Sequence, residues 1–373
     1  MSFSEIFRGE KPEGLQDYFT AGILSAMKPF YKVGLGIHRK LYEAGIKKKR
    51  RLSRRTVCIG NLTLGGSGKT PATMLAARLL SESSVKTAII SRGYGRSGKK
   101  SELVVVSDGE KILVPPSRAG DEPYMLATSL PGVPVVCCPD RYKAGSYVID
   151  HFEPEIVLMD DGFQHWALER NCDIVCIDAS RPLKQMRLFP RGPLREPVSG
   201  LKRAQAVVLT REGSSKQIQD TITLTRKIAG NIPIFRLNYK LSDPVPIFRE
   251  ETFDLSNDKM KSHHVLAFCG IADPESFYSL LRKKYPRIEG TVTFSDHVRY
   301  TPERMRDIQK EFVYRGANVI ITTEKDAVKI KELKLKRMPI YYCGLVTEFE
   351  NSEMEEQFLE VVRKFNKTGN DHE

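Results

Sequence analysis

The stretch that most constrains the fold is "NLTLGGSGKTP", Asn61 to Pro71, because it lies between a strand-like and a helix-like segment. The preceding "TVCIGN" is apolar enough for a buried strand, and the following "TPATMLAARLLSES" has the composition of a helix. Pro71 falls early in that helix, where its missing N–H costs little. A strand, a glycine loop and Lys-Thr at a helix start predict a phosphate-binding P-loop in an α/β domain.

The loop departs from the strict P-loop pattern at one position. Glycine is expected five residues before Gly68, and this chain has Thr63 there. Threonine is acceptable if the turn at that point does not need a positive φ. Lys69 is expected to reach the outer phosphates of a nucleotide, and Thr70 to ligate Mg²⁺. The predicted nucleotide-binding residues are Thr63, Leu64, Gly65, Gly66, Ser67, Gly68, Lys69 and Thr70.

An acidic pair follows another apolar run, in "EIVLMDDGFQH". Asp160 and Asp161 would stand at the C-terminal edge of a buried strand, where P-loop enzymes place a carboxylate for the metal. A pair of this kind can also cap a following helix. Beside a P-loop, we favour the metal-binding interpretation.

The apolar runs after residue 55 alternate with helix-like segments, which predicts a mostly parallel sheet covered on both faces. The stretch 236–255 differs, because it combines prolines with short β-prone pieces. We therefore expect an α/β fold with a P-loop NTPase-like domain over 51–235. A short β linker over 236–255 would lead to a smaller C-terminal α/β domain over 256–373.

The N-terminal arm, residues 1–50, is basic and amphipathic. Residues 1–55 contain 13 Lys and Arg against 5 Asp and Glu, a net charge of +8. A helical wheel places one set of apolar residues opposite Lys28, Lys32 and Arg39, and Pro29 predicts a kink or two shorter helices. Such a helix either lies on a membrane surface or packs on its own domain. The apolar set is Phe19, Ile23, Met27, Phe30, Ile37 and Leu41.

Composition argues against several other classes. The seven cysteines form no CxxC pair, which disfavours a zinc site and a disulfide framework, and no apolar run is long enough to span a bilayer. Basic residues of a nucleic-acid-binding protein are expected among stacking aromatics, whereas the aromatics of the arm lie mostly on its apolar face. We therefore expect no nucleic-acid partner, and nothing in the sequence indicates an obligatory protein partner.

Six motifs occur in a fixed order: "GNLTLGGSGKTP", "SRGYGR", "GDEPYML", "PDRYKAG", "DDGFQHWAL" and "RLFPRGPLREP". Together with "FCGIADPESF", "FSDHVRYT" and "TTEKDAVK" further along, they strongly resemble the tetraacyldisaccharide 4′-kinase family, the lipid A kinases of Gram-negative bacteria. The resemblance runs from about residue 18 to 365. Members of that family also lack the first glycine of the strict loop.

The resemblance implies a two-domain enzyme that transfers the γ-phosphoryl group of ATP. The acceptor would be the 4′-hydroxyl of a tetraacylated glucosamine disaccharide 1-phosphate, the lipid A precursor, with Mg²⁺ as cofactor. It also implies a peripheral protein on the anionic cytoplasmic face of the bacterial inner membrane. The basic amphipathic arm would then hold the active site at the level of the lipid headgroups.

The resemblance assigns roles to residues outside the loop. Asp121 and His297 would form the pair that activates the hydroxyl, although Asp121 could instead cap a helix and His297 could be a loop histidine. Glu122 would join Thr70, Asp160 and Asp161 at the metal. The predicted contacts to the substrate are Arg92, Tyr94, Arg141, Gln164, His165, Arg195 and Glu196.

Two features qualify this assignment. In "LKQMRLFPRGP", Lys184 and Gln185 occupy positions where the family favours small, turn-forming residues, so the resemblance does not define the loop conformation or the acceptor contacts there, although it still implies the reaction. The alternative function is a P-loop GTPase or ATPase switch, or a metal-insertion chaperone. "LTREG" and "TTEKD" do not match the N-K-x-D or T-K-x-D signature of guanine readers, which favours ATP.

Overall fold

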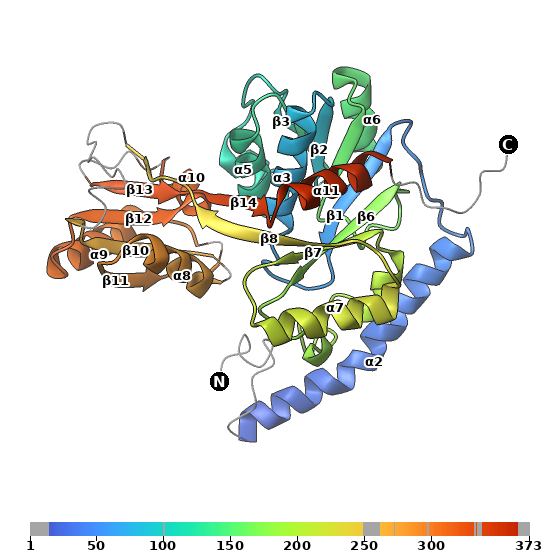
Figure 1. Cartoon of the computed structure of the whole chain (residues 1–373), viewed down its shortest axis with the longest axis horizontal. Helices are drawn as coiled ribbons and strands as arrows, with labels where there is room; N and C mark the ends of the chain where they lie inside the picture. The colour runs from blue at the N-terminus through green and yellow to red at the C-terminus, as the bar shows by residue number, and fades with distance from the viewer. Residues whose placement is uncertain are drawn as a thin grey trace.

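The long apolar runs of the sequence become the strands of two separate sheets in the computed structural model of the protein (Figure 1). The structure describes residues 15–99, 101–248, 262–271, 273–296, 298–331, 333 and 338–364. Within them, the larger sheet has nine strands in the order β14-β8-β7-β6-β1-β5-β2-β4-β3, and the smaller has five in the order β11-β10-β12-β13-β9. The expected α/β fold with a P-loop domain and a second α/β domain is confirmed.

The larger sheet is parallel except at its two edges, where β3 runs against β4 and β14 runs against β8. The strand β1 lies at its centre between β5 and β6. The strands are β1 (Arg55–Asn61), β2 (Thr87–Ser91), β3 (Val104–Ser107), β4 (Val135–Cys137), β5 (Ile156–Asp160), β6 (Cys172–Asp178), β7 (Ala206–Thr210), β8 (Ile234–Leu241) and β14 (Leu345–Phe349).

Both faces of this sheet are covered, as its continuous apolar strands require. One face packs on α3 (Lys69–Glu82), α5 (Asp121–Ser129) and α11 (Ser352–Lys364), through side chains such as Leu79, Leu126 and Phe358. The other face is covered by α6 (Arg141–Phe152), α7 (Ser215–Ala229) and the 3-10 helix η2 (Val198–Arg203). The shorter elements on this domain are α4 (Pro116–Ala119) and η1 (Leu183–Gln185).

The smaller sheet is also parallel, apart from β9 at one edge. Its two faces are covered by α8 (Pro274–Lys284) and by α9 (Pro302–Tyr314) with α10 (Glu324–Ile330). Its strands are β9 (Val245–Pro246), β10 (Val265–Cys269), β11 (Ile288–Thr293), β12 (Val319–Thr323) and β13 (Ile340–Cys343).

The end of the chain departs from the expected boundary of the C-terminal domain, 256–373. The strand β14 pairs with β8 in the larger sheet, and α11 packs on α3 through Phe358 and Val362. Residues 345–364 therefore return to the first domain. Two chain segments, β8 and β14, lie between the domains instead of a single linker over 236–255 (Figure 1).

The helix α2 (Leu15–Glu43) runs along the outside of the larger domain (Figure 1). Pro29 lies inside it, so of the two predicted alternatives, a kink or two shorter helices, the structure excludes the second. Tyr31 and Leu35 pack against the core, and the Tyr31 hydroxyl donates to the Arg195 carbonyl oxygen at 2.8 Å. The helix is therefore anchored along one side near its middle.

Candidate active site

The glycine loop joins the C-terminal end of β1 to the first turn of α3, as the sequence predicts. Gly65 and Gly68 have positive φ angles of 94° and 73°. A Cβ on Gly68 would lie 2.4 Å from the Tyr239 hydroxyl and 2.9 Å from Cβ of Thr210, so no larger residue fits there. Thr63 is not among the positive-φ residues, which explains why this chain tolerates threonine in place of the usual glycine.

The segment that follows η1 supports the loop from outside. The Leu64 amide donates to the Pro193 carbonyl at 2.7 Å, and the Arg195 amide donates to the Leu62 carbonyl at 2.7 Å. Inside the loop, the Asn61 side chain donates to the Thr63 carbonyl at 2.8 Å. The loop therefore has a defined shape before any phosphate binds.

Lys69, the first residue of α3, lies over the acidic pair at the end of β5. Its ammonium is 3.7 Å from Asp161 Oδ2 and its side chain is 8% exposed. Burial is the largest influence on the pKa of Lys69 and lowers it, but Asp161, Glu122 and Asp160 outweigh burial and leave that pKa raised. Lys69 therefore keeps its positive charge while largely shielded from water, which is the state that a phosphate-binding lysine needs.

The two aspartates of the pair have opposite environments. Burial raises the pKa of Asp161, but the cations Lys69 and Arg195 lead the influences that leave it lowered. Asp160 is fully buried, and burial together with the Glu122 charge raises its pKa to about 7. One carboxylate is thus neutralised by protein cations, and the other lacks full compensation. Neither caps a helix, because a turn follows Asp160.

One carboxylate oxygen of Asp160 is available to a cation. Its Oδ1 accepts from the Thr73 hydroxyl at 3.1 Å, whereas its Oδ2 is buried and has no hydrogen-bond partner in the described part of the chain. Thr70 is also buried and lies in the first turn of α3. Its hydroxyl is a hard oxygen ligand of the kind that Mg²⁺ prefers. No group of three or more His, Cys, Asp or Glu side chains gathers for a metal among the residues described. The donor set fits an ion that the protein shares with a triphosphate.

Arg195 and Glu196 form a connected polar network beside the aspartates. Arg195 makes a two-pronged contact with Asp161, at 2.7 and 3.3 Å, and donates to Gln164 Oε1 at 3.3 Å. Gln164 in turn donates to Glu196 Oε1 at 2.9 Å. Glu196 also accepts two bonds from Arg203, at 2.9 and 3.0 Å. These predicted substrate-binding residues therefore lie together, and Arg203 is a member that the sequence did not single out.

Arg141 and His165 lie close enough to interact electrostatically. Arg141 is 3% exposed and donates from Nη1 to the Cys138 and Pro139 carbonyls at 3.1 and 3.2 Å. Burial, reinforced by Arg141, lowers the pKa of His165 to about 4. His165 is therefore neutral at physiological pH. Arg92 and Tyr94 are exposed, with Tyr94 71% exposed, and both follow β2.

Asp121 does not cap a helix. The N-cap of α5 is Gly120, and Asp121 is the first helical residue. Its Oδ2 lies 3.2 Å from the Lys329 ammonium of the smaller domain. Glu122 raises the pKa values of Lys69 and Asp160 by its charge, which places it near the phosphate loop. His297 lies outside the described residues.

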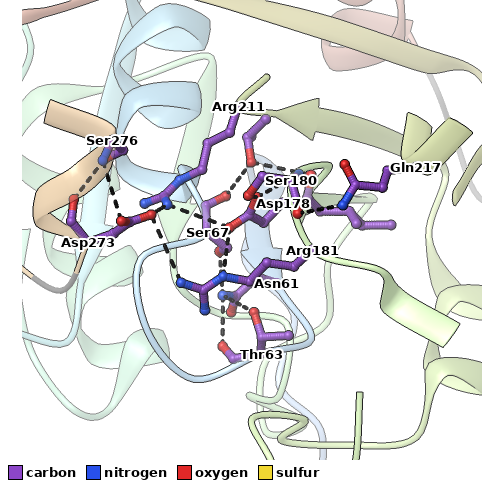
Figure 2. A network of polar contacts seen from close by, with 12 residues as sticks. Asn61, Thr63, Ser67, Asp178, Ser180, Arg181, Arg211, Gln217, Asp273 and Ser276 are labelled. Carbon is purple, nitrogen blue, oxygen red and sulfur yellow. Dashed lines mark hydrogen bonds and ion pairs between the residues drawn. The ribbon is translucent and has the colours of Figure 1, made fainter. Parts of the chain in front are cut away.

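A second set of ionic contacts crosses between the domains close to the phosphate loop (Figure 2). Arg211, which follows β7, contacts Asp273 of the smaller domain and lies 3.6 Å from Asp178. Arg181 lies 3.6 Å from Asp178 and 3.9 Å from Asp273. Thr210, next to Arg211, donates its hydroxyl to the Ser67 carbonyl at 2.9 Å. The position of the smaller domain is therefore linked to the phosphate loop.

Sequence reasoning missed the basic partners in these contacts. Lys329 belongs to "TTEKDAVK" and Arg211 to "LTREG", and as motifs these indicate only a family resemblance and the lack of a guanine-reading signature. Arg211 directly follows the buried strand β7, and Lys329 lies in α10, the helix that directly follows the buried strand β12. A basic residue in the segment that follows a buried strand could be recognised from the sequence as a candidate site residue, because the C-terminal ends of the strands line the functional edge of a parallel sheet.

Comparisons with known proteins show that the chain is similar to members of one family over most of its length. The family model described as Tetraacyldisaccharide-1-P 4′-kinase matches residues 20–363. A tetraacyldisaccharide 4′-kinase of Geobacter metallireducens is 36% identical over 348 residues, covering 93% of this chain and 98% of that protein. One from Desulfotalea psychrophila is 37% identical over 331 residues, covering 87% of this chain and 92% of that protein.

A solved structure extends the likeness to the fold. LpxK from Aquifex aeolicus, in complex with ATP, superposes with a TM-score of 0.71 at 27% sequence identity. The match covers 93% of this chain and 99% of that one. Both domains of the described fold are therefore shared with an ATP-binding protein.

Proposed function

Since the chain belongs to the tetraacyldisaccharide-1-P 4′-kinase family, we propose which of its residues carry the reaction of that family. The protein is an ATP-dependent kinase of lipid A biosynthesis. It transfers the γ-phosphoryl group to the 4′-hydroxyl of a tetraacylated glucosamine disaccharide 1-phosphate. The proposal depends on one observation: the ammonium of the buried Lys69, directly after a preorganised glycine loop, lies 3.7 Å from Oδ2 of Asp161.

Phosphoryl transfer depends mainly on positioning and on charge stabilisation. The backbone amides of Gly65 to Thr70 bind the β- and γ-phosphates, and the N-terminus of α3 favours the anion. Lys69 neutralises charge that develops on the transferred group. Its contact with Asp161, which Arg195 holds in turn, directs the ammonium toward the loop.

Mg²⁺ is assigned to Thr70, Asp160 and Glu122, with Asp161 beside them. The buried, unpartnered Oδ2 of Asp160 supports this assignment. When bound, the ion would neutralise phosphate charge and orient the γ-phosphoryl group. Without a cation, the buried carboxylate of Asp160 is uncompensated, which its raised pKa of about 7 reflects.

The acceptor hydroxyl is assigned to Asp121, which receives or orients its proton together with His297. The acceptor sugars and the 1-phosphate are assigned to Arg92, Tyr94, Arg141, Gln164, His165, Arg195 and Glu196. Among them, Arg195 and Glu196 are already paired within the protein, with Asp161 and Arg203. These two therefore shape the site, and we assign direct phosphate binding to Arg92 and Arg141.

The helix α2 is assigned to the surface of an anionic membrane, on the cytoplasmic side of the inner membrane. Its apolar residues recur at three- and four-residue spacings and are exposed to solvent. A helix that packed only on its own domain would bury this apolar face. None of the described helices combines the length and hydropathy of a bilayer-spanning segment. The exposed set is Phe19 72%, Ile23 48%, Met27 52%, Phe30 79%, Val33 59% and Ile37 54%.

The test is a transfer assay with defined substrates. Purified protein is incubated with γ-labelled ATP, Mg²⁺ and the tetraacylated disaccharide 1-phosphate in detergent, and the product is located by mass spectrometry. We expect label on the 4′-oxygen of the distal sugar. ATP hydrolysis that does not depend on the acceptor, or a preference for GTP, would contradict the proposal and favour a nucleotide-dependent switch.

A further inference from the structure

The short helix α10 of the smaller domain reaches the larger domain beside Asp121. It comes from "TTEKDAVK", a motif to which the proposed function gives no role. Its first residue, Glu324, accepts a bond from the hydroxyl of Ser129, the last residue of α5, at 3.1 Å. Asp121 is the first residue of the same α5. The two helices therefore lie against each other where the domains meet.

The position of α10 is fixed from its own domain. The buried Asp326 accepts from the Thr323 hydroxyl at 2.7 Å and from the Gly270 amide at 2.9 Å. Thr323 caps the helix by accepting from the Asp326 amide at 3.2 Å. These contacts tie the first turn of α10 to the ends of β10 and β12. The backbone from which the side chains of α10 project is therefore fixed in place.

Two lysines one turn apart on α10 contact acids at the edge of the proposed site. Lys325 lies 3.0 Å from Asp296 Oδ1, in the loop that carries the motif "FSDHVRY". Lys329 lies 3.2 Å from Asp121 Oδ2. Residues at i and i+4 share one face of a helix, so a single helix face contacts both segments that the reaction is assigned to.

The contact of Lys329 with Asp121 is shielded from water. The side chains are 13% and 22% exposed, and the ammonium nitrogen itself is buried with no hydrogen-bond partner in the described part of the chain. Removing a charge from water is costly, and a hydrophobic pair of similar volume would stabilise the interface at least as well. A cation at this point is therefore explained better by a task at Asp121 than by stability.

We propose that Lys329 is a positioning residue for phosphoryl transfer, which holds the Asp121 carboxylate in the orientation needed toward the acceptor hydroxyl. This inference rests on the function proposed above. The backbone before Asp121 turns at Gly120, which has a φ of 88° and where a Cβ would lie 2.7 Å from the Tyr94 carbonyl oxygen, so glycine is required there. The ammonium of Lys329, 3.2 Å from Oδ2 of Asp121, then contributes to holding the carboxylate in one orientation.

The test compares Lys329→Met with Lys329→Arg and with the control Lys331→Met. Lys331 lies on the same segment, is exposed and contacts the Tyr342 ring. We expect Lys329→Met to lower kcat about 10- to 100-fold, since a displaced catalytic group costs this much. The KM values for ATP and for the disaccharide should change less than about threefold, because the phosphate loop is untouched. Lys329→Arg should recover most of kcat, and Lys331→Met should match the wild type.

A double-mutant cycle separates positioning from a purely structural role. If Lys329 acts through Asp121, Lys329→Met should add little to the loss already caused by Asp121→Ala. An equal further loss in that background would overturn the proposal. So would a folded Lys329→Met with wild-type kcat, or one in which only the two KM values rise, which would indicate a domain clamp. If Lys329→Met does not fold, the proposal stands or falls on Lys329→Gln in the same cycle.

The same assay distinguishes the two levels of inference. A wild-type protein that makes no phosphorylated disaccharide would refute the proposed function, and the role of Lys329 with it. An active wild type with an equally active, folded Lys329→Met would refute only the positioning role. If Lys329 positions Asp121, the ATP affinity measured by calorimetry should be equal in the wild type and in Lys329→Met.

Discussion

Arg211 of the larger domain and Asp273 of the smaller domain form an ion pair directly beside the phosphate loop (Figure 2). Their side chains are only 18% and 23% exposed, so the contact is shielded from water. Asp273 also caps α8, accepting from the Ser276 amide at 3.4 Å. The hydroxyl of Thr210, next to Arg211, contacts the loop at Ser67. The arrangement of the domains and the shape of the loop are therefore coupled through a few polar contacts.

We expect Asp273→Asn to lower stability by about 1.5–3 kcal/mol, the contribution of a hydrogen bond to a charged group. Asparagine keeps the helix cap, so the change isolates the charge. ATP affinity should fall as well. Without the charge of Asp273, Arg211 keeps its ion pair with Asp178 but no longer ties the smaller domain to the strand end that supports the phosphate loop. Thermal unfolding and calorimetry measure the two effects. The matched control is Lys283→Ala, whose pair with Glu212 also crosses the domains but is 55% and 68% exposed. It should change stability by less than about 1 kcal/mol.

Lys69→Ala should reduce phosphoryl transfer about 10²- to 10³-fold or more, as expected when a group that stabilises transition-state charge is removed. The fold should persist, because Asp161 keeps its two contacts with Arg195. Steady-state kinetics and circular dichroism check these outcomes. Lys86→Ala, at an exposed position before β2, serves as the control with wild-type rates. Transfer by Lys69→Ala at a rate near that of the wild type would argue strongly against the proposed chemistry.

Asp160→Asn separates function from stability at a single position. Burial and Glu122 raise the pKa of Asp160 to about 7, so its ionised form destabilises the protein without nucleotide or metal as the pH rises from about 4 toward 7. A neutral asparagine avoids this loss. We expect an equal or higher melting temperature at neutral pH, together with a large loss of activity and a higher Mg²⁺ requirement. A marked drop in melting temperature would contradict this account.

Phe30→Asp combined with Ile37→Asp should weaken binding to anionic vesicles at least about tenfold, because each buried apolar side chain contributes about 1.5–3 kcal/mol. Turnover of a detergent-dispersed acceptor should stay close to wild type. Cosedimentation with vesicles of phosphatidylglycerol and phosphatidylethanolamine provides the measurement. Val313→Asp is the control, since Val313 is 71% exposed on α9, away from α2. Equal binding of both variants would show that α2 is not the contact.

Much of the fold was predictable because its signals are local. The apolar runs around Cys58 and Val175 predict buried strands, and the glycine loop with Lys69 predicts a helix start and an anion site. Thr63 was interpretable for the same reason, since its tolerance depends only on the φ of its own residue. The end of the chain was not predictable in this way. A short strand such as β14 carries no local mark of which sheet it joins, so its pairing with β8 could not be predicted from the sequence.

The sequence by itself determined the phosphate loop, the acidic pair at Asp160 and the amphipathic character of the N-terminal helix, because each depends on neighbouring residues and on helix or strand periodicity. Only the tertiary structure decided that Phe30 and its apolar neighbours on α2 remain exposed, and that Asp121 meets Lys329 across the domains. Solvent exposure and ion pairing depend on which distant segments pack together. That packing is set by the free energy of the whole chain, and no local pattern records it.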